Sequence, residues 1–538
     1  MAHDYEEELR KKVSREINLI KPAGGRLRFA LAYPNFYRVG MSNLGIHIIY
    51  ELLNSRLGIS CERFFLSDSN KILSLETQTP LNKFQIIGFA VSFEPDYFNV
   101  VKMLRLGKIN PRSSERTDFD PIIIAGGPCA TFNPVPLAEI FDAFVIGEGE
   151  VILPQLLDEI ISSENLPRLE RLEKLSQVAG VYVPAFPKKV SRLWLKDLDA
   201  YPAHSTILTD DAEFNMYLIE TARGCGRHCR FCMAGYCFRK PRNRSLDVLK
   251  NEIHSAKKFG KKIGLMGAAI SDYPQINELC EFILSEGLQM SVSSFRADSV
   301  TSELVKSLAA SGLKTLTIAP EVGSEKMRRV VNKGITEENI FTAIELGLKA
   351  GIKNFRLYFM VGLPFEELSD VEEIARLSLR IKKFCGGRLT LSVNPFVPKP
   401  FTPFQWSSFA KKKYLDAAFK ILRSQVKSTG GVEIISESIR SAEVQAILSR
   451  GDRKISEIIL QSETAQDFRK NFKAAGLDEE FYLRERPLEE NLAWDFLNQG
   501  FDKKYLIDEF NRAKNLKSTP RCFEGCTRCG VCSISNWE

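Results

Sequence analysis

The stretch ETARGCGRHCRFC, residues 220–232, decides how the rest of the chain is interpreted. It spaces Cys225, Cys229 and Cys232 as C-x3-C-x2-C, directly after the apolar run MYLIET that predicts a buried strand. Three thiolates bind three irons of a cubane 4Fe-4S cluster and leave the fourth iron open, which suits a substrate that chelates it through amino and carboxylate groups. A zinc site stays open as the alternative, because His228 or Cys237 could supply a fourth ligand.

Strands and helices alternate regularly from this motif onward. Six apolar runs within residues 214–406 predict parallel strands separated by helices: MYLIET, KIGLMG, MSVSSF, KTLTIAP, FRLYFMVG and RLTLSV. Six such units predict a partial (β/α)6 barrel of the TIM type rather than a complete eightfold one. We expect the chemistry at the carboxyl ends of these strands.

The segment before the barrel shows a similar alternation. RLRFALAYP, FQIIGFAVS, PIIIAGGP and DAFVIGEGE predict short buried strands within residues 26–160, with helical spacing between them. This pattern predicts an α/β fold with a doubly wound, Rossmann-like parallel sheet. The other expected segments are a short charged helix over 1–25, a linker over 161–213 with an extended stretch at VAGVYVPAF, a mostly helical region over 407–515 and a cysteine-rich tail over 516–538.

Composition narrows the class of protein. The 538 residues are 44% hydrophobic and 26% charged, as in soluble multi-domain enzymes. No apolar stretch approaches the ~20 residues that span a bilayer, and the N-terminus lacks a signal core, so we expect a cytoplasmic protein without membrane contact. The net charge of +7 is too small to indicate nucleic-acid binding by itself. Seven of the 12 cysteines form two tight groups, which indicates metal binding in a reducing compartment.

The loops after the other barrel strands resemble those of the radical S-adenosylmethionine (SAM) superfamily. GLMGAA contains Gly267, SVSSFRADS contains Ser294 and Arg296, APEVGSE contains Glu321, and Phe231 precedes the last cysteine of the motif. The resemblance implies that a 4Fe-4S cluster cleaves SAM to a 5'-deoxyadenosyl radical. It also implies that the backbone at Gly267 receives the SAM amino group, that Arg296, with Ser294 nearby, holds its carboxylate, and that Glu321 accepts from its ribose. FMVGLP resembles the strand that lies along adenine.

Nearly the whole chain resembles one branch of that superfamily, which has an N-terminal cobalamin-binding-like domain and includes a largely uncharacterised group. In this branch the AGGP and GEGE segments approach the corrin, which implies close backbone contact at Gly126, Gly127 and Gly147. The Asp-x-His-x-x-Gly loop that supplies a cobalt ligand in many cobalamin proteins is absent, since this chain has NFYRVGMSNLG there. His47 lies just beyond, on an apolar helical face, and is predicted to pack in the core. Cobalamin is therefore expected without a histidine ligand, and the alternative is a relic domain that only shapes the substrate site.

The second group of cysteines ends the chain. CFEGCTRCGVC places Cys522, Cys526, Cys529 and Cys532 within eleven residues. Structural zinc usually draws cysteine pairs from separated knuckles, so this compact spacing favours a second iron-sulfur cluster over zinc. Such a centre could relay electrons to the central cluster or position substrate, or it could serve only as a metal staple for the tail.

A basic run, FRKPRNRS, follows the central motif. Its cations are Arg239, Lys240, Arg242 and Arg244, and we expect them near the mouth of the barrel. A solvated charged rim is the first interpretation, and attraction of an anionic substrate such as RNA is the second.

These features predict a radical SAM enzyme, with cobalamin-dependent methyl transfer to an unactivated carbon as one outcome. An electron donor such as flavodoxin or ferredoxin and anaerobic conditions are expected. Two alternatives stay open: a cobalamin-independent enzyme that modifies RNA or another anionic substrate, and a non-catalytic iron-sulfur or zinc protein.

Overall fold

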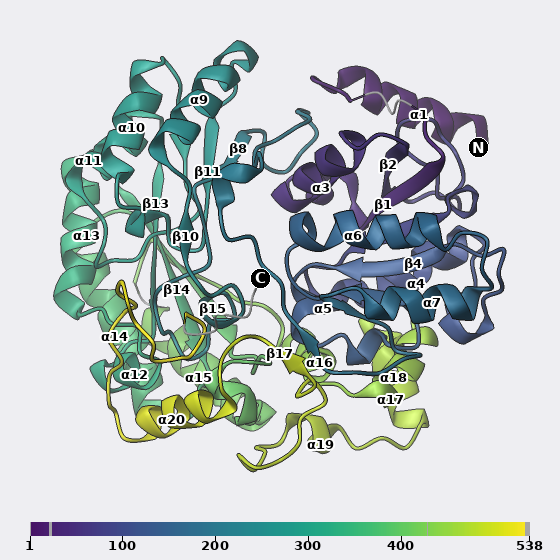
Figure 1. Cartoon of the computed structure of the whole chain (residues 1–538). Coiled ribbons are helices and arrows are strands. Elements are labelled where there is room, and N and C mark those ends of the chain that lie inside the picture. The colour runs from purple at the N-terminus through teal and green to yellow at the C-terminus, as the bar shows by residue number, and fades with distance from the viewer. Residues whose placement is uncertain (1, 21–23, 428, 533–538) are drawn as a thin grey trace.

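Two α/β units lie side by side, and the C-terminal helices run beneath both of them in the view of Figure 1. The computed structural model describes residues 2–20, 24–427 and 429–532. Within these ranges, every helix is too short or too polar to span a lipid bilayer. The predicted α/β class, with a helical C-terminal region, is confirmed.

The N-terminal unit is built on a sheet with the strand order β2-β1-β3-β4-β5-β6. Its strands are β1 (Leu27–Phe36), β2 (Ile59–Leu66), β3 (Ile86–Ala90), β4 (Ile122–Gly126), β5 (Ala143–Val145) and β6 (Val181–Tyr182). Neighbouring strands are parallel except for β5 and β6. The order of the first five strands is that of a doubly wound sheet, as predicted.

Helices cover both faces of this sheet because alternate strand residues point to opposite sides. Phe29 and Leu31 pack with α3 (Leu44–Asn54) and α6 (Gly149–Ser162) on one face, whereas Ala30 and Ala32 pack with α4 (Tyr97–Leu106) on the other. The helices of the unit are α1 (Ala2–Arg15), α2 (Tyr37–Gly40), α3 (Leu44–Asn54), α4 (Tyr97–Leu106), α5 (Pro128–Phe132), α6 (Gly149–Ser162) and α7 (Arg168–Gln177).

The N-terminal unit continues beyond the boundary expected at residue 160. Helix α7 and strand β6 belong to it, although both lie in the segment expected to be a linker. Strand β6 coincides with the extended stretch VAGVYVPAF. It closes the sheet as an antiparallel edge of only two residues, which is too short to produce a periodic pattern in the sequence.

The second unit is an open barrel of parallel strands. Its strands are β8 (Tyr217–Glu220), β11 (Ile263–Met266), β12 (Met290–Ser291), β13 (Thr315–Glu321), β14 (Asn354–Val361), β15 (Leu389–Pro395) and β16 (Val432–Ile435). They form the rows β8-β11-β12 and β13-β14-β15-β16, which a bridge between Phe295 and Ile318 connects. The six predicted strands are confirmed. The seventh, β16, was missed because it is short, half exposed and set among helices.

Helices surround the barrel and continue into the C-terminal region. They are α9 (Leu246–Ala256), α10 (Ile276–Ser285), α11 (Ser302–Ala310), α12 (Glu325–Val330), α13 (Glu337–Lys349), α14 (Leu368–Cys385), α15 (Lys412–Val426), α16 (Ile439–Ser449), α17 (Arg453–Leu460), α18 (Ala465–Ala474), α19 (Glu479–Leu483) and α20 (Lys503–Lys514). Helices α16 to α19 lie under the N-terminal unit and α20 under the barrel (Figure 1). Strand β17 (Leu497–Asn498) pairs with β7 (Val190–Ser191). Helix α17 packs against α4 of the N-terminal unit and α20 packs against α12 beside the barrel, so the C-terminal region contacts both units.

Candidate active site between the sheet and the barrel

The three cysteines of the central motif lie in one loop after the first barrel strand. The loop runs from β9 (Ala222–Arg223) to α8 (Ala234–Cys237) and is closed by the pairing of β9 with β10 (Arg242–Asn243). The amide of Cys232 donates to the carbonyl of Cys229 at 3.0 Å, and the amide of Arg227 donates to Sγ of Cys225 at 3.4 Å. These bonds fold the motif into a tight loop.

The electrostatics of this loop suit a metal centre. Burial, and after it the thiols of Cys229 and Cys225, raise the pKa of Cys232 to about 12. Adjacent buried thiolates need a compensating positive charge, which iron supplies. Among the described residues, no three His, Cys, Asp or Glu side chains converge closely enough to hold one metal ion. A cubane cluster instead bonds each cysteine to a different iron, and the donor set fits it.

Two cations lie beside the cysteine loop. Nη1 of Arg296 is 3.6 Å from Sγ of Cys229, and its Nε pairs with Asp298 at 3.1 Å. Lys333, which is 6% exposed, pairs with Glu321 at 2.8 Å. Glu321 has a φ of 69°, in the left-handed region that few non-glycine residues adopt. Sequence reasoning missed Lys333, because Glu321 and the cysteines that it lies beside are separated from it along the chain.

The other residues predicted to contact SAM lie at the ends of neighbouring strands. Gly267 follows β11, and a Cβ there would lie 3.1 Å from Oγ1 of Thr221, so this turn suits a residue without a side chain. Ser294 is half-buried, two residues before Arg296. Phe231 packs against an apolar cluster that contains Val322. The fold thus gathers these residues at one end of the barrel, and their contacts with SAM stay predictions.

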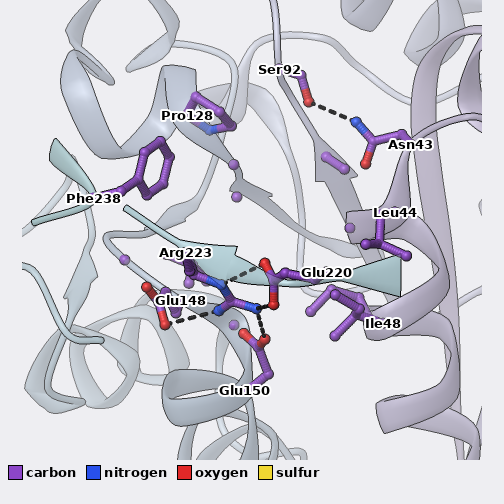
Figure 2. Close-up of a pocket in the computed structure, with 18 of the residues that line it drawn as sticks. Asn43, Leu44, Ile48, Ser92, Pro128, Glu148, Glu150, Glu220, Arg223 and Phe238 are labelled. Atoms are coloured by element: carbon purple, nitrogen blue, oxygen red, sulfur yellow. Dashed lines mark hydrogen bonds and ion pairs between the residues drawn. The ribbon is translucent and has the colours of Figure 1, made fainter. Parts of the chain in front are cut away.

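A cavity of about 480 Å³ lies between the N-terminal sheet and the barrel (Figure 2). Gly126, Gly127 and Gly147 line it from the sheet, and Gly224 and Gly267 line it from the barrel. Four glycines singled out in the sequence therefore meet around one space. The cavity borders the cysteine loop, because its lining residue Gly224 directly precedes the first cysteine.

The three sheet glycines serve different purposes. Gly147 has a φ of 128°, and a Cβ there would lie 2.0 Å from the carbonyl oxygen of Leu193. Gly127 has a φ of 95°, with Val91 O at 2.8 Å from the same hypothetical atom. Both positions require glycine for the backbone itself. A Cβ at Gly126 would meet only Val145, at 3.9 Å, so this glycine leaves free space on the cavity side.

A buried ion-pair network forms one wall of the cavity. Arg223 pairs with Glu148 at 2.9 Å, with Glu150 at 2.8 Å and with Glu220 at 3.0 Å, as Figure 2 shows. Burial alone would lower the pKa of Arg223, but the three carboxylates outweigh it and raise that pKa. The GEGE segment of the sheet is thus tied to the strand that enters the cysteine loop.

The basic run after the motif is not the solvated rim that we expected. Arg239, Arg242 and Arg244 are buried, and of the four cations only Lys240 is exposed. Arg242 and Arg244 pair with carboxylates of the ion-pair network at 2.7 and 3.1 Å. The sequence prediction was wrong because the partners of these arginines, on the sheet and on β8, are distant along the chain. Arg242 and Arg244 thus neutralise internal carboxylates, whereas Arg239 donates to the carbonyls of Gly235 and Arg227.

His47 behaves as predicted. Its ring is 2% exposed, and its Nε2 lies 3.0 Å from the carbonyl oxygen of Met41. Burial lowers the pKa of His47 to about 4, so the imidazole is neutral at pH 7. Among the described residues that line the cavity, none is a histidine.

The C-terminal cysteines lie against the central loop. The amide of Cys522 donates to the carbonyl of Gly226 at 2.8 Å. Cys526 and Cys529 are buried and Cys532 is exposed. Nothing in the sequence indicated this contact, and residues 533–538 of the predicted tail lie outside the described residues.

Comparisons with known proteins agree with this geometry. Residues 219–378 match the radical SAM superfamily, and residues 45–184 match the family described as radical SAM proteins, N-terminal. The chain is 35% identical over 438 residues to the uncharacterized protein MJ0966 of Methanocaldococcus jannaschii. The matched region covers 80% of this chain and 90% of that protein. It is 26% identical to the putative methylthiotransferase MJ0865 of the same organism, over 46% of this chain and 55% of that protein.

A solved structure shows the same fold. The radical SAM methyltransferase TsrM from Kitasatospora setae, with cobalamin and a 4Fe-4S cluster bound, superposes with a TM-score of 0.54. The match has 14% sequence identity and covers 84% of this chain and 100% of that chain. Both units of the fold therefore occur together in another protein.

Proposed function

This chain belongs to the radical SAM superfamily, and we propose that it methylates an unactivated carbon with the help of SAM, a 4Fe-4S cluster and cobalamin. The observation that carries the proposal is the cavity that joins Gly126 and Gly147 of the sheet to Gly224 and Gly267 of the barrel. A corrin in this cavity would face the loop with the three cysteines. That neighbourhood suits the transfer of a methyl group to a substrate at the end of the barrel.

The cysteine loop would hold the cluster. When bound, the cluster supplies one electron that splits SAM into methionine and a 5'-deoxyadenosyl radical, which takes a hydrogen atom from the substrate. The chain itself would hold and orient SAM. The guanidinium of Arg296, already beside Sγ of Cys229, suits the SAM carboxylate. Glu321, held by Lys333, suits the ribose hydroxyls, and the backbone carbonyls near Gly267 suit the amino group.

The lining of the cavity suits the face of a corrin. Its walls are mostly apolar, and Gly126 leaves an open face. Cobalamin, when bound, would supply a methyl group taken from a second SAM molecule, which leaves as S-adenosylhomocysteine, because the SAM split by the cluster keeps its methyl group in methionine. The protein would contribute the apolar walls, which exclude water from the reacting carbon. The TsrM structure supports the assignment, because cobalamin is bound in a protein of this fold.

Narrowing the cavity tests the cobalamin part of the proposal. A leucine at Gly126 would project into free space without a backbone clash, so we expect Gly126→Leu to fold normally and to exclude the corrin. Cobalamin binding after anaerobic reconstitution, followed by absorbance, should weaken at least roughly tenfold. The matched control is Gly430→Leu, an exposed position where a Cβ meets nothing within 4 Å.

The outcomes separate clearly. Loss of cobalamin in Gly126→Leu with an unchanged melting temperature and full cobalamin binding in Gly430→Leu would support the proposal. Transfer of the methyl carbon of labelled SAM to a product should then stop as well. Equal cobalamin binding in both variants, or none in the wild-type protein, would contradict it. The enzyme would in that case use SAM-derived radical chemistry without cobalamin.

A further inference from the structure

The C-terminal cysteine segment is docked on the central cysteine loop. The backbone bond from Cys522 to Gly226 joins the two segments next to Cys225. Sγ of Cys522 also lies 3.4 Å from Nε2 of His228, which directly precedes Cys229. Each of the first two cysteines of the central motif therefore has a neighbour in the sequence that touches the tail.

Buried hydrogen bonds hold the tail in this position. Asn332 donates to the carbonyl of Thr519 at 3.0 Å and accepts from its amide at 2.9 Å, and it also donates to the carbonyl of His228 at 3.1 Å. Arg230, which has no exposed surface, pairs with Glu509 at 3.0 Å. A second guanidinium nitrogen of Arg230 donates to the carbonyl of residue 517. The docking thus involves Arg230 of the central motif and Asn332, which follows α12 of the barrel.

The four tail cysteines form a compact group of free thiols. Cys526 and Cys529 are 7% and 5% exposed, and none of the four is in a disulfide. Four adjacent thiols in a partly buried turn form a donor set for a metal cluster.

We propose that Cys522, Cys526, Cys529 and Cys532 hold a second iron-sulfur cluster, through which electrons enter the central site. The relay rests on the proposed function, whereas the cluster itself does not. One electron from a reduced flavodoxin- or ferredoxin-type protein reduces the tail cluster, and the same electron then passes to the central cluster. The donor is oxidised by one electron, and no bond is made or broken.

The surroundings of the tail match this role. Cys532 is exposed and Phe523 is 64% exposed, so a protein donor can reach this end of the site. Arg521 and Arg528 are exposed residues of the tail, and the exposed Lys240 lies near Cys532; these positive charges outnumber the charge of the exposed Glu524 and suit an acidic donor. On the inner side, the contacts to Gly226 and His228 lead to the central loop.

Iron counting tests the cluster without any SAM chemistry. After anaerobic reconstitution with iron and sulfide, the wild-type chain should hold about eight irons, from two cubane clusters. A variant with all four tail cysteines changed to serine should hold about four. The reciprocal variant, with Cys225, Cys229 and Cys232 changed to alanine, should also hold about four and should keep a reducible cluster signal in electron paramagnetic resonance. This second variant leaves the tail intact, so the proposal can be judged even if the serine variant does not fold.

A wild-type chain with about four irons and one tightly bound zinc would overturn the proposal in favour of a zinc staple. The relay is tested by comparing SAM cleavage driven by a protein donor with cleavage driven by dithionite. The rate of SAM cleavage by the serine variant should fall at least roughly tenfold with the protein donor and far less with dithionite. Equal losses with both reductants would overturn the relay. If the wild-type chain cleaves no SAM at all, the proposed function fails, while the iron count still decides the second cluster.

Discussion

Removal of Arg223 should destabilise the interface between the two units. Arg223 pairs with three carboxylates, but two of them retain another partner: Glu148 keeps Arg242 and Glu220 keeps Arg244. Glu150 pairs with no other cation among the described residues, and its side chain is only 6% exposed. Arg223→Met would therefore leave one buried carboxylate without compensation.

The expected cost follows from that orphaned charge. Loss of one partner of a buried ion pair typically costs about 3–5 kcal/mol, because the remaining charge is desolvated and unpaired. The double variant Arg223→Met/Glu150→Gln removes both charges, so it should recover most of that loss. The difference between the losses of stability in the single and double variants separates the effect of the unpaired charge from the loss of packing by the arginine side chain.

Urea titration of the metal-free, reduced protein measures this coupling. Trp194 lies against Arg242, with 5.0 Å between the guanidinium carbon and the ring centroid, so it contributes a signal from the network to the fluorescence of the chain's four tryptophans. We expect a lower unfolding midpoint for the single variant and a midpoint near wild type for the double variant. A loss below about 1 kcal/mol in the single variant, or no recovery in the double variant, would refute the reasoning.

Four further substitutions have expected outcomes. Burial raises the pKa of Asp96 to about 6, so the stability contributed by its protonated form is complete below pH 4 and is lost as the pH rises through 6. In urea titrations, Asp96→Asn should therefore add roughly 2–3 kcal/mol to the free energy of unfolding at pH 7.5 and nothing at pH 4. Equal gains at both pH values would contradict this. Gly147→Ala should lower the free energy of unfolding by more than about 2 kcal/mol because of its backbone clash, whereas Gly126→Ala should change it by less than about 0.5 kcal/mol. Similar melting temperatures for the two variants would contradict the roles assigned to these glycines. Lys333→Met frees Glu321 and should raise the KM for SAM about tenfold with full iron content, and an unchanged KM would show that the pair does not position SAM.

Local patterns in the sequence predicted the strands and the cysteine loop. The spacing of Cys225, Cys229 and Cys232 is a property of a few consecutive residues, and the six barrel strands are continuous apolar runs. Gly126, Gly127, Gly147 and Gly267 were named because the AGGP, GEGE and GLMGAA segments resemble those of the superfamily, and the structure places all four around one cavity. Such local features can be recognised in the sequence without knowledge of the fold.

Features that depend on long-range pairing were missed. The buried arginines after the motif read as a surface charge run, because their carboxylate partners lie on β8 and on the distant sheet. Lys333 gains its importance only from Glu321 and from the cysteine loop beside it. The docking of the tail on Gly226 joins residues almost 300 positions apart, and no local pattern encodes such a contact. Strands β6 and β16 were too short to leave a period.

The formation of 5'-deoxyadenosine tests the central claim most directly. The chain is reconstituted anaerobically with iron and sulfide, reduced with dithionite and incubated with SAM, next to the variant with Cys225→Ala, Cys229→Ala and Cys232→Ala. We predict 5'-deoxyadenosine from the wild-type chain and none from this variant. A wild-type chain with a loaded central cluster that neither binds nor cleaves SAM would contradict the assignment of the site.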